Sequence, residues 1–87
     1  MDIHYTKGRI TNALSLLALD PGDLSSRVPK ACGELMTASY RQGFEREFSR
    51  IAEIMKAVSY GGWGNVLESE IREIAVIIWR LAERITQ

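Results

Sequence analysis

The C-terminal segment, residues 65–85, constrains the fold more than any other part of the chain. Its apolar residues recur three or four positions apart, which is the spacing of one face of an α-helix. These residues are Leu67, Ile71, Ile74, Ile78, Leu81 and Ile85. Asn65 and Glu68 have the spacing of a capping box, in which both side chains bind free amides of the first helical turn. The sequence therefore predicts one long helix from about Asn65 to Ile85.

This predicted helix has more than one apolar face. Residues 74–79 are six apolar residues in succession, so they surround the helix at that level and must be covered on all sides. One explanation is that the helix lies at the centre of the fold. The other is that a second copy of the chain covers Val76, Ile77 and Trp79. We favour the second explanation, which predicts a homo-oligomer, because two-fold homodimers are the commonest small assemblies.

Another helix is predicted before the glycine-rich stretch 60–64. Its apolar residues recur at helical spacing, and they are Phe44, Phe48, Ile51, Met55 and Val58. A capping box of Ser39 and Gln42 would start this helix near Tyr40. Because Gly43 weakens that first turn, the alternative start is Gly43 itself. The glycines of the stretch 60–64 end the helix, since glycine costs backbone entropy there.

Two further helices are predicted in the N-terminal half. Thr6 is the candidate cap of the first, whose apolar face is Ile10, Ala13, Leu14 and Leu17. Residues 20–23 form a turn that places Pro21 at the first position of the second helix. Pro29 interrupts that helix, because proline removes an internal hydrogen bond. We expect either a kink, or a short turn over 21–26 followed by a helix from about Arg27.

These patterns predict an all-α fold. No segment shows the alternation of a β-strand, and no internal repeat is present. Four helices joined by short loops, with a long helix at the C-terminus, form a small four-helix bundle or an irregular helical array. A chain of 87 residues has room for one hydrophobic core, so we expect residues 1–87 to be a single domain.

Composition narrows the classes of function. Eleven basic residues balance eleven acidic ones, so binding of nucleic acid through bulk positive charge is disfavoured. No apolar run approaches the ~20 residues of a membrane span. Residues 1–4 lack the basic and apolar regions of a signal peptide. We therefore expect a cytoplasmic protein with no membrane partner.

Catalysis, metals and cofactors are also disfavoured. Cys32 is the single cysteine, which excludes an internal disulfide and a cysteine-based zinc site. His4 is the single histidine, and it would be the base for any reactive thiol or hydroxyl. No serine lies in a recognisable nucleophile motif. The expectation is a protein that is not an enzyme and needs no metal or cofactor.

The glycine-rich stretch 60–64 carries the clearest candidate for a binding site. Tyr60 and Trp63 are aromatic anchors of the kind that dominate protein interfaces, and Tyr40 and Arg41 are further candidate contact residues. The alternative is a simple helix–helix turn whose aromatic side chains fold over the core. The stretch lacks the Lys-Ser/Thr pair that follows the last glycine of a phosphate-binding P-loop.

Basic residues support a second hypothesis. A surface formed by Lys7, Arg9, Arg41, Arg46 and Arg50 could bind nucleic acid or a nucleotide. The alternative is that these side chains are ordinary solvated surface. The leading hypothesis remains a small non-catalytic interaction module, a regulator, inhibitor or adaptor. Tyr60, Trp63, Tyr40 and Arg41 would bind a protein partner, and Val76, Ile77 and Trp79 would mediate self-association.

Overall fold

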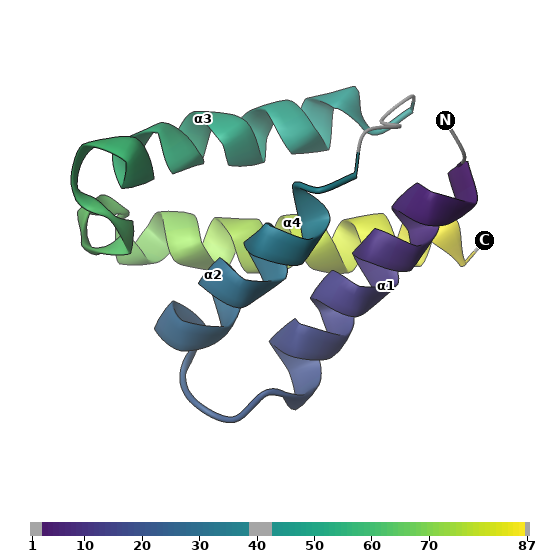
Figure 1. The fold of residues 1–87 in the computed structure, drawn as a ribbon, viewed down its shortest axis with the longest axis horizontal. Coiled ribbons are helices and arrows are strands. Elements are labelled where there is room, and N and C mark those ends of the chain that lie inside the picture. The colour runs from purple at the N-terminus through teal and green to yellow at the C-terminus, as the bar shows by residue number, and fades with distance from the viewer. Residues whose placement is uncertain (1–2, 39–42, 87) are drawn as a thin grey trace.

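The structure, a computed structural model, describes residues 3–38 and 43–86 (Figure 1). Those residues form four α-helices and one short 3₁₀ helix, with no strand among them. In chain order these elements are α1 (Ile3–Leu19), α2 (Leu24–Leu35), α3 (Glu45–Gly61), η1 (Trp63–Asn65) and α4 (Glu68–Ile85). The predicted all-α class and the long C-terminal helix are confirmed.

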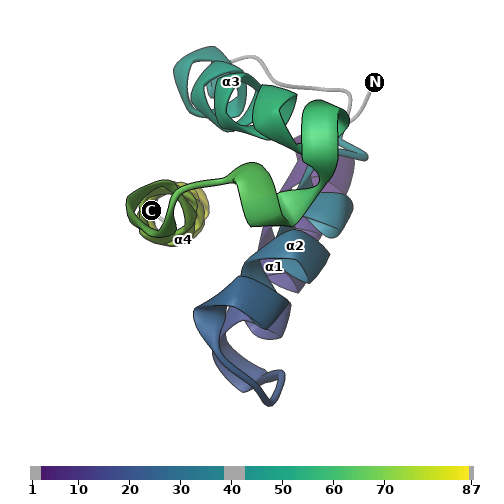
Figure 2. The same cartoon turned by 90° about the vertical axis from the view of Figure 1, so that its left-hand side faces the viewer.

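The helices are arranged as two antiparallel hairpins. α1 and α2 form the first hairpin, α3 and α4 form the second, and α4 crosses behind α1 and α2 in Figure 1. α4 contacts all three other helices, and it contacts α1 and α2 more extensively than α3. Seen along α4, the other helices lie on one side of it (Figure 2). α4 therefore closes one side of the fold and leaves its own opposite side uncovered.

The apolar faces of the four helices meet in one cluster of buried residues. The largest side chains that are fully buried in it include Phe48, Ile10, Leu35, Ile51, Ile74, Ile78 and Leu81. Each predicted apolar stripe therefore contributes to the core. Full burial of one such side chain contributes about 1.5–3 kcal/mol to stability. Packing of these stripes, more than helix propensity, holds the helices together.

The N-terminal helix boundaries differ from the prediction. α1 begins at Ile3, so Thr6 lies inside the helix and is fully buried there, and it is not the cap. The cap of α2 is Asp23, whose side chain accepts a hydrogen bond from the Ser26 amide at 3.1 Å. The prediction that Pro21 occupies the first helical position is wrong, because Gly22 adopts a φ of 111° and extends the turn.

Pro29 lies inside a helix that continues from Leu24 to Leu35. The predicted separate turn over 21–26 is therefore wrong. Proline at this position removes the amide that would bond to the Ser25 carbonyl one turn earlier. Because Ser25 is exposed, water can bind that carbonyl instead, and the helix tolerates the loss.

The second hairpin also begins its helices later than predicted. α3 starts at Glu45 and not at Tyr40 or Gly43, and the proposed Ser39–Gln42 capping box lies outside the described residues. α3 ends where Gly62 adopts a φ of 80°, which confirms the glycine stop.

The predicted Asn65–Glu68 capping box of α4 is wrong. Asn65 belongs to η1, and α4 starts at Glu68. The Leu67 amide donates a hydrogen bond to the Glu70 carboxylate at 3.1 Å. The glutamate that caps the helix is therefore Glu70, two residues after the predicted Glu68. Leu67 precedes the helix and is exposed, although its spacing placed it on the core stripe.

Candidate functional site

Large apolar side chains remain exposed at two places on the second hairpin. Tyr60 is 88% exposed and Leu67 is 65% exposed at the junction of α3 and α4. Val76 is 47% exposed and Trp79 is 56% exposed on the outer face of α4. We call the first place, Tyr60, Trp63 and Leu67, the junction surface, and the second, Val76 and Trp79, the outer apolar patch.

The junction surface is shaped by two neighbouring glycines. Gly62 takes the positive φ that turns the chain from α3 into η1. Gly61 lies against the side chain of Asn65, and a Cβ at Gly61 would come within 2.4 Å of the Asn65 amide nitrogen. A larger residue at Gly61 would therefore push Asn65 away from the end of α3. Backbone conformation thus favours glycine at position 62 and the contact with Asn65 favours it at position 61, whereas a Cβ at Gly64 would meet open space.

The two aromatic residues of the junction have different surroundings. Trp63 is partly buried and packs against the core cluster, as the simple helix–helix turn predicts. Tyr60 projects into solvent, as a binding residue would. Beside Trp63 is an open cleft of about 390 Å³, lined by Ser25, Trp63, Gly64, Val66, Glu68 and Ile71. The junction thus combines one projecting aromatic side chain with a concave surface.

The cleft contains little that could perform acid–base chemistry. Glu68 is the one titratable residue in its lining, and it pairs with Arg72 at 2.9 Å on the exposed surface. Among residues 3–38 and 43–86, no three His, Cys, Asp or Glu side chains are grouped to hold a metal ion. Burial raises the pKa of Cys32 to about 12, so its thiol stays protonated at neutral pH.

The apolar run 74–79 is divided between core and solvent. Ile74, Ile77 and Ile78 are buried within the chain, whereas Val76 and Trp79 are exposed. The prediction that Ile77 lies on the same outer face is wrong, because α4 turns Ile77 toward the other helices. The alternative explanation, that the helix lies at the centre of the fold, is also wrong, since Val76 and Trp79 on one face of α4 remain exposed.

Trp79 also borders a small apolar groove between α1 and α4. The groove has a volume of about 170 Å³ and is lined by Leu14, Trp79, Ala82, Glu83 and Thr86. It continues the outer apolar patch toward α1. Within the described helices, none is long and apolar enough to span a lipid bilayer.

Two of the five candidate nucleic-acid contacts are engaged in ion pairs. Arg9 pairs with Glu34 on α2 at 2.5 Å and lies over the Tyr5 ring at 5.0 Å. The hydrogen bond to Glu34 is the main cause of a raised Arg9 pKa. Arg50 donates two hydrogen bonds to Glu73 on α4, at 2.5 and 2.9 Å. The same hydrogen bonds raise the pKa of Arg50 and lower the pKa of Glu73.

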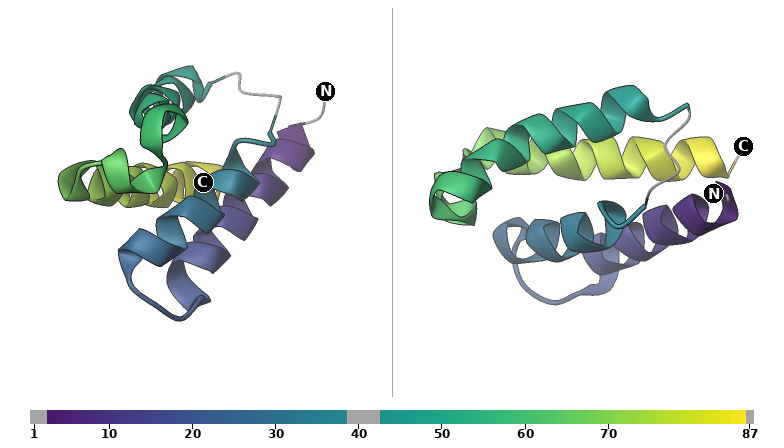
Figure 3. Two further views of the ribbon diagram at one scale, coloured as in Figure 1. Left: turned by 60° about the vertical axis from the view of Figure 1, so that its left-hand side comes forward. Right: turned by 45° about the horizontal axis from the view of Figure 1, so that its top comes forward.

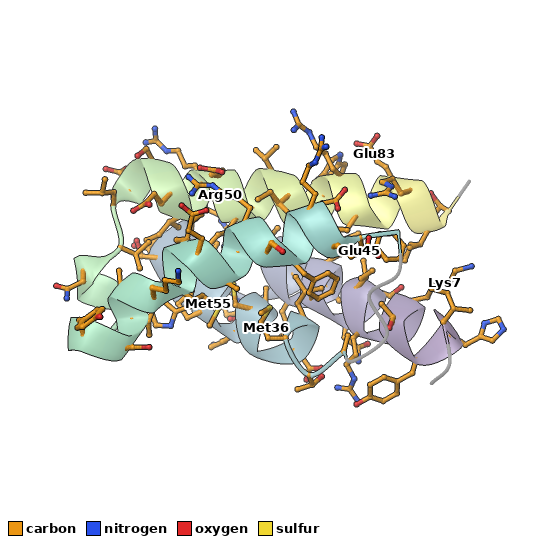
Figure 4. All side chains as sticks on the ribbon, turned by 90° about the horizontal axis from the view of Figure 1, so that it is seen from above. Lys7, Met36, Glu45, Arg50, Met55 and Glu83 are labelled. Carbon is orange, nitrogen blue, oxygen red and sulfur yellow. The ribbon has the colours of Figure 1, made fainter. Side chains whose placement is uncertain are left out.

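The candidates on α1 are separated from those on α3. Lys7 on α1 and Arg50 on α3 lie well apart in Figure 4, with Lys7 at the right-hand end of the molecule and Arg50 left of its centre. Arg46 is exposed on α3. Arg41 and Tyr40, which are also predicted to contact a protein partner, fall outside the described residues. Because Lys7 is separated from Arg50, the candidate residues that the structure describes form no continuous basic patch in one copy of the chain.

Comparisons of this chain with protein-family models, with curated proteins and with solved structures found no match.

Proposed function

We propose that this protein is a non-catalytic interaction module, a regulator, inhibitor or adaptor, that binds a protein partner and self-associates. The observation that supports this proposal is the junction surface. There Tyr60 and Leu67 stay exposed at the junction of α3 and α4, whose residues Trp63, Gly64, Val66 and Glu68 line an open cleft, although the same chain buries a full core. Exposed apolar residues next to a concave surface are typical of sites that bind proteins.

Tyr60 and Trp63 have different roles in this proposal. Tyr60 is the anchor, because its ring is exposed and its hydroxyl can hydrogen-bond to a partner. Trp63 forms a wall of the cleft and also supports the core, so its truncation would lower stability as well as binding. Tyr60 is therefore the better residue for testing partner binding. The outer apolar patch on α4 is left for self-association.

The partner surface is tested by capture from an extract of the source cell. Wild-type protein, Tyr60→Ser and Leu19→Ser are immobilised at equal density, and captured proteins are identified by mass spectrometry. Leu19 is the matched control because it is 81% exposed on α1, away from the junction. We expect one partner that binds wild type and Leu19→Ser but is lost from Tyr60→Ser. Equal capture by all three would exclude the junction surface.

The nucleic-acid hypothesis is the main competing outcome. Labelled duplex and single-stranded DNA are titrated with the protein at low salt and again at higher salt. Binding that weakens steeply with salt would contradict the proposal and support a basic site. The ion pairs of Arg9 and Arg50 reduce the positive charge that such a site could offer.

A further inference from the structure

The outer face of α4 has a regular pattern of its own. Six exposed residues recur at alternating spacings of three and four, and they are Ser69, Arg72, Val76, Trp79, Glu83 and Thr86. This spacing averages 3.5, which is the repeat of helices that pack along a shared seam. The buried residues of α4, such as Ile74, Ile78 and Leu81, lie on the opposite side of the helix. We call these six residues the outer stripe.

The midpoint of the outer stripe falls between Ile77 and Ile78, and residues at equal distances on either side of it have matching chemical character. The inner pair, Val76 and Trp79, is apolar. The next pair, Arg72 and Glu83, is oppositely charged, and the outermost pair, Ser69 and Thr86, carries hydroxyl groups. Both members of each pair are equally far from the midpoint. A two-fold axis through the midpoint would therefore match every position with a compatible one.

An antiparallel arrangement of two such helices is the one that satisfies the charges. It places Arg72 opposite the partner's Glu83 and Val76 opposite the partner's Trp79, each twice. A parallel arrangement would place Arg72 opposite Arg72 and Glu83 opposite Glu83, which is unfavourable. Opposite charges that face each other across a helix seam are known to set orientation and partner choice.

The fold leaves this face accessible. α1, α2 and α3 lie on one side of α4, and the outer side is open (Figure 2). Glu83 points away from α3 in Figure 4, and it forms no ion pair with another described residue. Arg72 pairs with Glu68 at 2.9 Å, but both side chains are largely exposed. Such a surface pair is weak and exchangeable.

We propose that two copies of this chain pair antiparallel along α4 through the outer stripe. The Val76 and Trp79 side chains form the apolar centre of the interface, and two Arg72–Glu83 ion pairs flank it. The apolar groove beside Trp79 adjoins this interface through Trp79, Glu83 and Thr86, so a partner helix also covers that edge of the groove. The inference rests on the proposed self-association and adds its symmetry and register.

The test is charge reversal, with molar mass measured by light scattering after size exclusion over a series of concentrations. Wild type is expected to reach twice the 9.8 kDa of one chain. Arg72→Glu and Glu83→Arg each turn both attractive pairs into repulsive ones and should raise the dimer Kd about tenfold or more. The double variant exchanges the charges and should restore the wild-type Kd.

Mixing the two single variants gives the sharpest result. In an antiparallel heterodimer the two new side chains face each other, and so do the two native ones. An equimolar mixture should therefore dimerise more tightly than either variant alone. Trp79→Ser should raise the Kd by about 30-fold or more, as loss of a central aromatic anchor does. Circular dichroism confirms that each variant is folded.

The matched control is Arg46→Glu, a charge reversal at an exposed arginine on α3. Its dimer Kd should equal that of wild type. A wild-type dimer that is insensitive to Arg72→Glu and Glu83→Arg would overturn this register and leave the proposed self-association intact. A wild-type monomer at every concentration would overturn both, while capture through Tyr60 would still test the partner surface independently.

Discussion

The two helical hairpins achieve packing in different ways. α1 and α2 lie side by side in both views of Figure 3, whereas α3 and α4 do so in one view only. Beside larger buried residues such as Ile10 and Leu35, the first hairpin contributes the small buried residues Ala13, Ala31 and Cys32, which let two helices approach closely. The helices of the second hairpin bury large residues, such as Phe48 and Ile78, with Ala82 as the exception. Small side chains thus bring one pair of helices together, and bulky side chains hold the other pair apart.

Long charged side chains connect the two helices of the second hairpin by ion pairs. Arg50 reaches from α3 to Glu73 on α4. Arg84 reaches from α4 to Glu47 on α3, bonds the Gly43 carbonyl and lies over the Phe44 ring at 4.7 Å. These partly exposed contacts span the space that bulky residues leave between the helices. The comparison predicts that the first hairpin is sensitive to added volume and the second to lost volume.

The largest expected effect is the loss of volume in the second hairpin. Phe48 is 1% exposed, and Phe48→Ala removes a large side chain from the core and leaves a cavity. We expect the free energy of unfolding to fall by about 3–5 kcal/mol. Urea denaturation monitored by circular dichroism measures it. A loss below that of Ala31→Leu would break the contrast between the hairpins.

The next effect is the gain of volume in the first hairpin. Ala31 on α2 is fully buried, so Ala31→Leu must push α2 away from its neighbours. We expect a loss of about 1–3 kcal/mol in the same measurement. Ala18→Leu on α1 is the control, since Ala18 is exposed and the added side chain meets solvent. Equal stability of the two variants would show that α1 and α2 are not closely packed at Ala31.

A smaller effect concerns the turn that closes the first hairpin. The Asp23 side chain caps α2 by accepting the Ser26 amide at 3.1 Å. Asp23→Ala leaves that amide to solvent and should cost about 1 kcal/mol. Asp23→Asn keeps an acceptor oxygen and should remain close to wild type. Thermal denaturation of both variants distinguishes loss of the cap from loss of the charge.

The smallest effect is the acid dependence of the bridge between α3 and α4. Arg50 holds the pKa of Glu73 below its usual range in the folded state. The ionised carboxylate therefore stabilises the fold above the unfolded carboxyl pKa, and this contribution is lost as the pH falls through the lowered pKa. We expect Glu73→Gln to lose less stability than wild type on acidification.

Urea midpoints measured from neutral to acidic pH test this expectation. Glu53→Gln is the control, because Glu53 lies farther from Arg50, at 3.4 Å, and is more exposed than Glu73. Its acid dependence should remain close to that of wild type. Identical acid dependence of Glu73→Gln and wild type would show that the bridge does not stabilise the second hairpin.

The helix boundaries were predicted less accurately from the sequence than the helices themselves. The apolar spacing located all four helices, but the caps at Thr6 and Asn65 were wrong. Several polar residues near a helix start can accept the same amides, and small differences in turn geometry select one of them. At the start of α4 the side chain that accepts the free amide is Glu70, because Asn65 belongs to η1.

The candidate site was predictable to a similar extent. Tyr60 stood out in the sequence because a glycine-rich turn exposes its aromatic residues, and it is exposed. Ile77 was misplaced, because six consecutive apolar residues do not indicate which of them meet the chain's own core. The opposite charges of Arg72 and Glu83 can be seen in the sequence. They indicate a seam for a second helix only once the structure places both residues on one exposed face of α4.

The sequence by itself determined the helical class and the position of the turns, because backbone hydrogen bonding and apolar periodicity act over a few neighbouring residues. The tertiary structure alone decided which face of α4 is covered and which arginines are neutralised. Those outcomes depend on contacts such as Arg9–Glu34 and Arg50–Glu73, which join residues far apart in the chain. Such contacts form when packing of the bulky core residues sets the positions of the helices, and that information lies in no single segment.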